Sequence, residues 1–291
     1  MSEWSTYNEA LIVQIQGWLA EDVGSGDIST MTTIPAGSTS RAVIHAKQDG
    51  IIAGLPVAEQ VFRVVDKALL FKPLVQEGDF ITSGTVIAEV EGSTHSLLTG
   101  ERLALNLMQR LSGIATKTRS FVDQVSDLPV RLVDTRKTTP GHRMLEKYAV
   151  RVGGGANHRF GLYDAVMIKD NHIKGAGGIR EAVEAARRRI PHTMKIEVET
   201  ESFAQIEEAL ASGADIIMLD NMGLDAMANA VSHIRQQAPH VIIEASGGVS
   251  LGSVRGIAET GVDVISVGAL TYSFDALDIS LDLGSKKGAA E

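Results

Sequence analysis

The stretch PVRLVDTRKTTPG, residues 129–141, sets a pattern that the second half of the chain repeats. Its apolar run ends at Val133, and a polar segment that contains Arg136 and Lys137 separates this run from the turn Pro140-Gly141. This order predicts a short buried strand followed by a loop. Because ligands of α/β barrels and open α/β sheets bind at the carboxyl ends of the strands, the loop is a candidate binding site.

The same strand-then-helix rhythm continues almost to the end of the chain. The predicted strands are residues 130–133, 165–168, 194–198, 216–219, 241–244 and 264–267, and the predicted helices are 143–151, 178–190, 202–212, 224–237 and 251–260. Alternation at this spacing predicts right-handed βαβ units and a parallel sheet. Six or seven such strands favour an incomplete α/β barrel. The alternative is a doubly wound open sheet, but no G-x-G-x-x-G motif follows the first strand.

The first part of the chain has a different pattern. A helix is predicted over residues 7–21, and short strands separated by glycine-containing turns are predicted over 41–91, with one helix near 56–65. These features indicate an α+β segment with antiparallel strands. A long apolar periodicity over 101–126 predicts a buried helix that links this segment to the repeating part. The tail, 275–291, is expected to fray.

The composition excludes several classes of function. The formal net charge of −9 argues against nucleic acid or a membrane surface as a partner, because phosphates are repelled on average. The absence of cysteine excludes disulfides, thiolate nucleophiles and cysteine-based metal sites. No apolar run reaches the ~18 residues of a membrane span, and the amino terminus lacks the features of a signal peptide. We therefore expect a cytoplasmic protein.

Polar or small residues follow each of the six predicted strands. In chain order they are Thr135, Arg136 and Lys137; Lys169; Glu199; Asp220; Ser246, Gly247 and Gly248; and Gly268 and Ala269. On one barrel they converge on one mouth. Cations follow the first two strands, carboxylates the next two and small residues the last two, which predicts a site for an anion that also carries hydroxyl groups.

Each group of residues suggests a part of the ligand. Backbone N–H groups at Ser246-Gly247-Gly248 and Val267-Gly268-Ala269, each ahead of a predicted helix, are suited to a phosphate. The pair His158-Arg159 follows a run of glycines and adds to the cations, and arginine favours carboxylates and phosphates. Glu199 and Asp220 suit sugar hydroxyls or Mg²⁺. The residues alone indicate a phosphoribosyl-type or sugar-phosphate enzyme.

The chain resembles the quinolinate phosphoribosyltransferases, the nicotinate-nucleotide pyrophosphorylases (carboxylating) of NAD biosynthesis. The resemblance covers nearly the whole chain, and its marks are EDVGSGDIST (21–30), TGERLALNLMQRLSGIAT (99–116), DTRKTTPG (134–141), LEKYAVRVGGGANHRFGLYDAVMIKDNH (145–172), IEVE (196–199), MLDN (218–221), EASGGV (244–249) and SVGALT (266–271). It implies that quinolinate and phosphoribosyl pyrophosphate give nicotinate mononucleotide, pyrophosphate and carbon dioxide, with Mg²⁺ as cofactor.

The resemblance also implies an architecture. It implies an α/β fold with an N-terminal α/β sandwich domain, residues 1–107, that the C-terminal tail 275–291 joins. Residues 108–274 would form an incomplete TIM-like α/β barrel of roughly seven strands. The resemblance further implies a homodimer, or a higher assembly, in which one subunit's N-terminal domain caps the other's barrel. Each active site would then be shared between two subunits.

The resemblance assigns roles residue by residue. The quinolinate-binding residues would be Arg102, Thr135, Arg136, His158, Arg159 and Lys169. The residues that bind phosphoribosyl pyrophosphate would be Lys137, Glu199, Asp220, Ser246, Gly247, Gly248, Val267, Gly268 and Ala269. Of these, Glu199 and Asp220 would also hold Mg²⁺, directly or through the substrate.

Three alternatives stay open at this point. A molybdenum-transport-associated relative shares much of the framework, although the segment KDNH at 169–172 favours the quinolinate enzyme. A Schiff-base aldolase is a second alternative, because Lys169 ends a barrel strand. A non-catalytic anion-binding module is the third.

Overall fold

The computed structural model describes residues 8–284 and divides into two compact units. One unit contains the chain up to Thr116 together with the segment from Asp275 onward, and the other is Lys117–Phe274. The division lies inside helix α4 (Thr94–Asp123), whereas the sequence predicted a boundary between residues 107 and 108. The tail 275–291 was expected to fray, but residues 279–283 form a strand, and the rest of the tail from residue 285 lies outside the described residues. No helix in the described part is long and apolar enough to cross a membrane.

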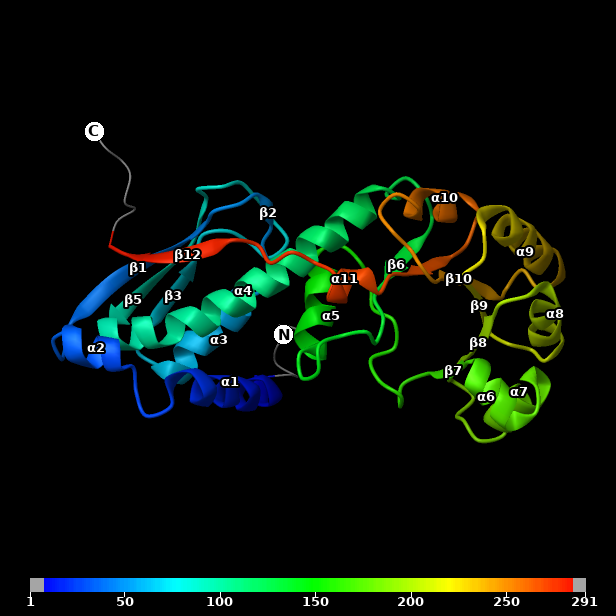
Figure 1. Cartoon of the computed structure of the whole chain (residues 1–291), viewed down its shortest axis with the longest axis horizontal. Coiled ribbons are helices and arrows are strands. Elements are labelled where there is room, and N and C mark those ends of the chain that lie inside the picture. Colours follow the sequence, from blue (N-terminus) through cyan, green and yellow to red (C-terminus); the bar gives the residue numbers. More distant parts are fainter. Residues whose placement is uncertain (1–7, 285–291) are drawn as a thin grey trace. The chain divides into compact units, whose positions relative to one another are not determined.

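The first unit is built on an antiparallel sheet in the order β12-β1-β5-β3, as the α+β pattern predicted. Its strands are β1 (Thr39–Ala46), β3 (Leu70–Pro73), β5 (Val86–Ser93) and β12 (Ile279–Leu283), and the short strands β2 (Gly50–Ile51) and β4 (Phe80–Ile81) form a separate pair. Its helices are α1 (Asn8–Val23), α2 (Ile28–Thr33), α3 (Leu55–Val65) and the first part of α4. Strand β12 returns from the end of the chain to pair with β1, so the tail belongs to this unit (Figure 1).

The second unit is an incomplete α/β barrel. Its six strands, all parallel, have the order β6-β11-β10-β9-β8-β7, and they are β6 (Arg131–Val133), β7 (Val166–Ile168), β8 (Ile196–Thr200), β9 (Ile216–Asp220), β10 (Ile242–Ser246) and β11 (Val264–Ser266). The first strand pairs with the last, as in a closed barrel. Among the described residues no ladder joins β6 to β7, and a single bridge, Val133 to Ala156, occupies that gap. The barrel therefore has six strands where the resemblance implied roughly seven.

Helices cover the outside of this barrel (Figure 1). They are α5 (Arg143–Val152), α6 (Asp170–Ala176), α7 (Ile179–Arg187), α8 (Phe203–Ala211), α9 (Leu224–Gln237), α10 (Val254–Glu259) and α11 (Ala269–Tyr272). The strands are buried on both faces, which explains why they are almost continuous apolar runs in the sequence. Two short helices, α6 and α11, were not predicted. Helix α6 begins directly after Lys169, where the ring of His172 accepts a hydrogen bond from the Lys169 backbone N–H at 3.0 Å.

Candidate active site

A cavity of about 550 Å³ lies at the carboxyl ends of the barrel strands. It is lined by Thr135, Arg136, Lys137, His158, Arg159, Met167, Lys169, Glu199, Met218, Asp220, Asn221, Glu244, Ser246, Gly247, Gly248 and Ser266. The structure thus brings together residues from all six strand ends, as the parallel arrangement predicts. All of the predicted site residues belong to this lining except Arg102, Val267, Gly268 and Ala269.

The segment Val267–Ala269 packs against the site without lining it. Val267 is buried, and a Cβ on Gly268 would lie 2.7 Å from the ring of Tyr272 and 3.1 Å from the side chain of Lys137. The hydroxyl of Thr271 donates to the backbone carbonyl of Lys137 at 2.8 Å. This turn therefore holds the Lys137 segment in place. Its predicted contact with a phosphate stays a prediction.

Arg102 belongs to the first unit. It lies on helix α4, its side chain is 59% exposed, and its guanidinium is 3.7 Å from the carboxylate of Glu101. Arg102 does not line the cavity. Its assignment as a quinolinate ligand stays a prediction.

The cationic groups are held by defined partners. The ammonium of Lys169 forms an ion pair with the carboxylate of Glu199. The guanidinium of Arg159 donates to the carbonyl of Ala165 at 3.1 Å and contacts the sulfur of Met167 at 3.6 Å. Burial lowers the pKa of Arg159, and the charge of Arg136 lowers it further. Two guanidinium groups that repel each other favour an anion between them, so this side of the cavity suits a ligand with several negative charges.

A buried ion pair fixes the loop that carries His158 and Arg159. Asp134 and Lys147 are almost completely buried and pair with each other. Burial raises the pKa of Asp134 and lowers that of Lys147, while their mutual attraction opposes both changes. Asp134 also accepts hydrogen bonds from Asn157 Nδ2 at 2.6 Å and from the His158 backbone N–H at 2.9 Å, and Lys147 donates to the His158 carbonyl at 3.1 Å. The pair therefore positions the two cavity-lining residues that follow.

A second layer of polar side chains lies deeper in the barrel. Side chains two residues apart point to the same face of a strand, so Glu197 lies on the same face as Glu199, and Glu244 on the same face as Ser246, each about 6.6 Å deeper. Both glutamates are almost completely buried. Neither glutamate was predicted as a site residue, although each lies two residues before a predicted site residue at the end of a strand, and that spacing could have identified both.

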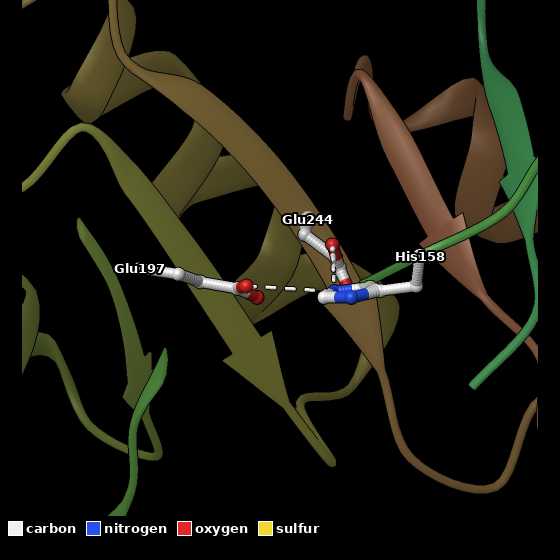
Figure 2. Close-up of side chains that lie close together, drawn as sticks. All are labelled: His158, Glu197 and Glu244. Carbon is white, nitrogen blue, oxygen red and sulfur yellow. Dashed lines mark ion pairs between the residues drawn. The ribbon is translucent and has the colours of Figure 1, made fainter. Parts of the chain in front are cut away.

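His158 enters this deeper layer from its loop (Figure 2). Its Nε2 atom lies 3.4 Å from Glu197 and 3.3 Å from Glu244. Burial disfavours the charged imidazole, but hydrogen bonds and charge from the two glutamates outweigh burial and raise the pKa of His158 to about 10. Burial and the charge of Glu244 raise the pKa of Glu197. His158 lines the cavity, and its assignment as a quinolinate ligand stays a prediction.

The glycine-containing turn after β10 approaches the β9 end closely. Gly247 has a φ of +93°, and a Cβ there would lie 2.2 Å from Asn221 Oδ1 and 2.9 Å from the Asn221 backbone nitrogen. Asn221 in turn donates to Asp220 at 2.6 Å. Helix α10 begins at Val254, six residues after Gly248, so the turn does not lie at the predicted helix amino terminus. Any phosphate contact here rests on the turn itself.

This geometry predicts different costs for two neighbouring substitutions. Gly247→Ala should lower the free energy of unfolding by about 1–3 kcal/mol, because it combines backbone strain with the contact to Asn221. Gly248→Ala is the matched control, because a Cβ there would meet nothing within 4 Å and φ is +59°; its cost should be about 1 kcal/mol or less. Urea unfolding measures both variants. Equal losses would show that the approach to Asn221 is unimportant.

Comparison with known proteins places these observations in a family. The family model described as "Quinolinate phosphoribosyl transferase, C-terminal domain" matches residues 114–282, and that of the N-terminal domain matches residues 27–112. The chain is 51% identical to a probable nicotinate-nucleotide pyrophosphorylase (carboxylating) from Synechocystis sp. over 92% of this chain and 91% of that protein. It is 48% identical to a protein of the same name from Bacillus subtilis, over 90% of each chain.

A solved structure agrees with the fold of the whole chain. The nicotinate-nucleotide pyrophosphorylase from Francisella tularensis superposes with a TM-score of 0.90 at 39% identity, over 95% of this chain and 97% of that one. The match includes both the sheet-containing first unit and the incomplete barrel, and it confirms the predicted combination of an N-terminal sandwich domain with an α/β barrel. This chain belongs to the quinolinate phosphoribosyltransferase family.

Proposed function

We propose that this chain transfers the phosphoribosyl group of phosphoribosyl pyrophosphate to quinolinate. One carboxylate leaves as carbon dioxide, and the other products are nicotinate mononucleotide and pyrophosphate. Membership of the family and the names of its relatives support this activity. The single observation that carries it is one cavity that is lined both by several cations and by the carboxylates Glu199 and Asp220.

The lining residues can perform the steps that this reaction needs. Arg136 and Arg159 present planar donors that match the carboxylates of quinolinate, and these charges also stabilise the electron pair left on the ring when carbon dioxide departs. Glu199 and Asp220 accept hydrogen bonds from ribose hydroxyls and stabilise positive charge that develops on the ribose carbon. Lys137 suits the pyrophosphate. The Lys169–Glu199 ion pair keeps the site balanced before the substrates bind.

Mg²⁺ fits the donor chemistry of this cavity. Glu199 and Asp220 supply the oxygen ligands that Mg²⁺ prefers, and a bound pyrophosphate group would supply more. We propose that the ion is held by these carboxylates together with the substrate. When bound, it would neutralise charge on the leaving pyrophosphate.

We further propose that the protein acts as a homodimer with shared sites, because the resemblance assigns a ligand role to Arg102 while that residue does not line the cavity. The cytoplasmic location, and the exclusion of nucleic acid and membranes as partners, stay predictions from the composition. Assembly beyond a dimer is likewise a prediction.

Turnover by the purified chain tests this function directly. With Mg²⁺ and phosphoribosyl pyrophosphate, quinolinate should be converted to nicotinate mononucleotide, and a chelator should suppress the reaction. Nicotinate should be a poor substrate, because it would leave a cation of the cavity unpaired, and an unpaired buried charge costs several kcal/mol. Comparable kcat/KM values for the two acids would contradict the assignment of the cations to a dicarboxylate.

The Schiff-base alternative is disfavoured by the contact that Lys169 makes. A lysine nucleophile has to be neutral to attack a carbonyl group, whereas the ammonium of Lys169 is paired with Glu199. Borohydride treatment with a carbonyl substrate should therefore leave no covalent adduct. An adduct at Lys169 would favour the aldolase-type activity instead.

A further inference from the structure

One carboxylate of the cavity lining is not explained by the binding of either substrate. Glu244 lines the cavity from the deeper layer and is only 3% exposed. Its Oε1 atom, like that of Glu197, is buried and has no hydrogen-bond partner in the structure. The two carboxylates at the strand ends are placed differently, because Glu199 pairs with Lys169 and Asp220 accepts from Asn221. A buried carboxylate with an unused oxygen is costly unless a proton or a ligand compensates it.

The surroundings of Glu244 favour a proton as the compensating group. Glu244 lies 3.3 Å from Nε2 of His158, and Glu197 faces the same nitrogen (Figure 2). The backbone N–H of Arg159 points at Nδ1 of His158 at 2.7 Å, so the ring proton that faces the two carboxylates is the one on Nε2. One N–H group then serves two carboxylates. A second proton shared with the carboxylates would relieve their repulsion.

A metal ion suits this cluster less well, although the three side chains offer ligand atoms within 4.8 Å of one another. Metal binding at Nε2 would move the ring proton to Nδ1. That nitrogen faces the Arg159 N–H, which cannot accept a proton.

We propose that Glu244 is the acid that protonates the ring carbon of the product after carbon dioxide leaves, a role that rests on the proposed function. The bond between the ring carbon and the departing carboxylate breaks, and its electron pair stays on the ring carbon. The carboxylic acid of Glu244 gives its proton to that carbon, a C–H bond forms, and Glu244 becomes a carboxylate. A proton from water restores the acid, so the overall reaction consumes one proton. His158 and Glu197 hold Glu244 in place and are positioning residues.

The two glutamates provide a matched pair of variants. Glu244→Gln and Glu197→Gln each remove one carboxylate from the same nitrogen of His158, but only Glu244 lines the cavity. Glu244→Gln should lower kcat about 100-fold or more, the usual contribution of a general acid, with little change in the KM for quinolinate. Glu197→Gln should show a smaller loss. Thermal unfolding of both variants monitors the fold.

A second measurement isolates the proton transfer. An acid that delivers a proton to the ring carbon must also remove it in reverse, so wild-type protein in D₂O should exchange the corresponding hydrogen of added nicotinate mononucleotide. Proton NMR at saturating nucleotide follows this exchange. We expect Glu244→Gln to abolish the exchange and Glu197→Gln to retain it. The exchange by wild-type protein tests the proposal independently of the folding of any variant.

Three results would overturn the proposal. They are the absence of exchange in wild-type protein that turns over quinolinate, undiminished exchange in Glu244→Gln, and equal loss in both variants, which would assign the whole cluster to the positioning of His158. Failure of the proposed function is a separate result, because wild-type protein would then form no nicotinate mononucleotide from quinolinate.

Discussion

Replacement of Asp134 by alanine is expected to lower the free energy of unfolding by about 3–5 kcal/mol and to abolish turnover. The variant leaves the ammonium of Lys147 buried without its counter-ion, and an uncompensated charge in that position has no access to water. It also removes the acceptor for Asn157 and for the His158 backbone N–H. The loop would then no longer hold His158 and Arg159 in the cavity. Urea unfolding and a turnover assay measure the two effects.

Two further variants separate the ion pair from a general loss of charge. Lys147→Met combined with Asp134→Ala should cost less than the sum of the two single changes, because the double variant leaves no buried charge unpaired. Asp127→Ala breaks an exposed pair with Arg255 in the same unit and should have a far smaller effect. If Asp134→Ala were no more destabilising than Asp127→Ala, the buried pair would not anchor the loop.

The barrel could be predicted because each of its strands has a recognisable local sequence pattern. Each buried strand is a short apolar run, and the run ends where the polar residues of the mouth begin, as at Val133 and Asp134. Lys169, Glu199 and Asp220 follow the same rule, and all three line the cavity. Strand ends could therefore be located without knowledge of the tertiary structure.

The buried residues that hold the cavity-lining loop and His158 in place could not be predicted in the same way. Lys147 lies in a helix, and only the fold shows that it points to Asp134 and not to solvent. Glu197 and Glu244 interrupt apolar strands, but their pairing with His158 depends on how a loop enters the barrel. Strand β12 was missed for a related reason, since its partner β1 lies more than 200 residues earlier. Contacts over such distances leave no local pattern.

The role of Arg102 can be decided by mixing two inactive variants. Arg102→Ala and Lys169→Ala should each lose most activity if both side chains bind quinolinate, because each removes a cation from the same ligand. Lys169 lines the barrel cavity, whereas Arg102 lies in the first unit and its side chain is 59% exposed. In the proposed homodimer, Arg102 of one subunit would complete the cavity of the other. Each variant alone would then have one damaged residue in every site.

A heterodimer of the two variants would have one doubly damaged site and one intact site. Random reassociation at equal amounts makes about half of the dimers mixed, and half of their sites are intact, so activity should return to about a quarter of the wild-type value. Differently tagged chains confirm that mixed dimers have formed, and each variant reassociated with itself is the control. Recovery near this value requires that Arg102 acts across the dimer. Mixed dimers that form but stay inactive would place Arg102 in its own subunit's site or outside the site altogether.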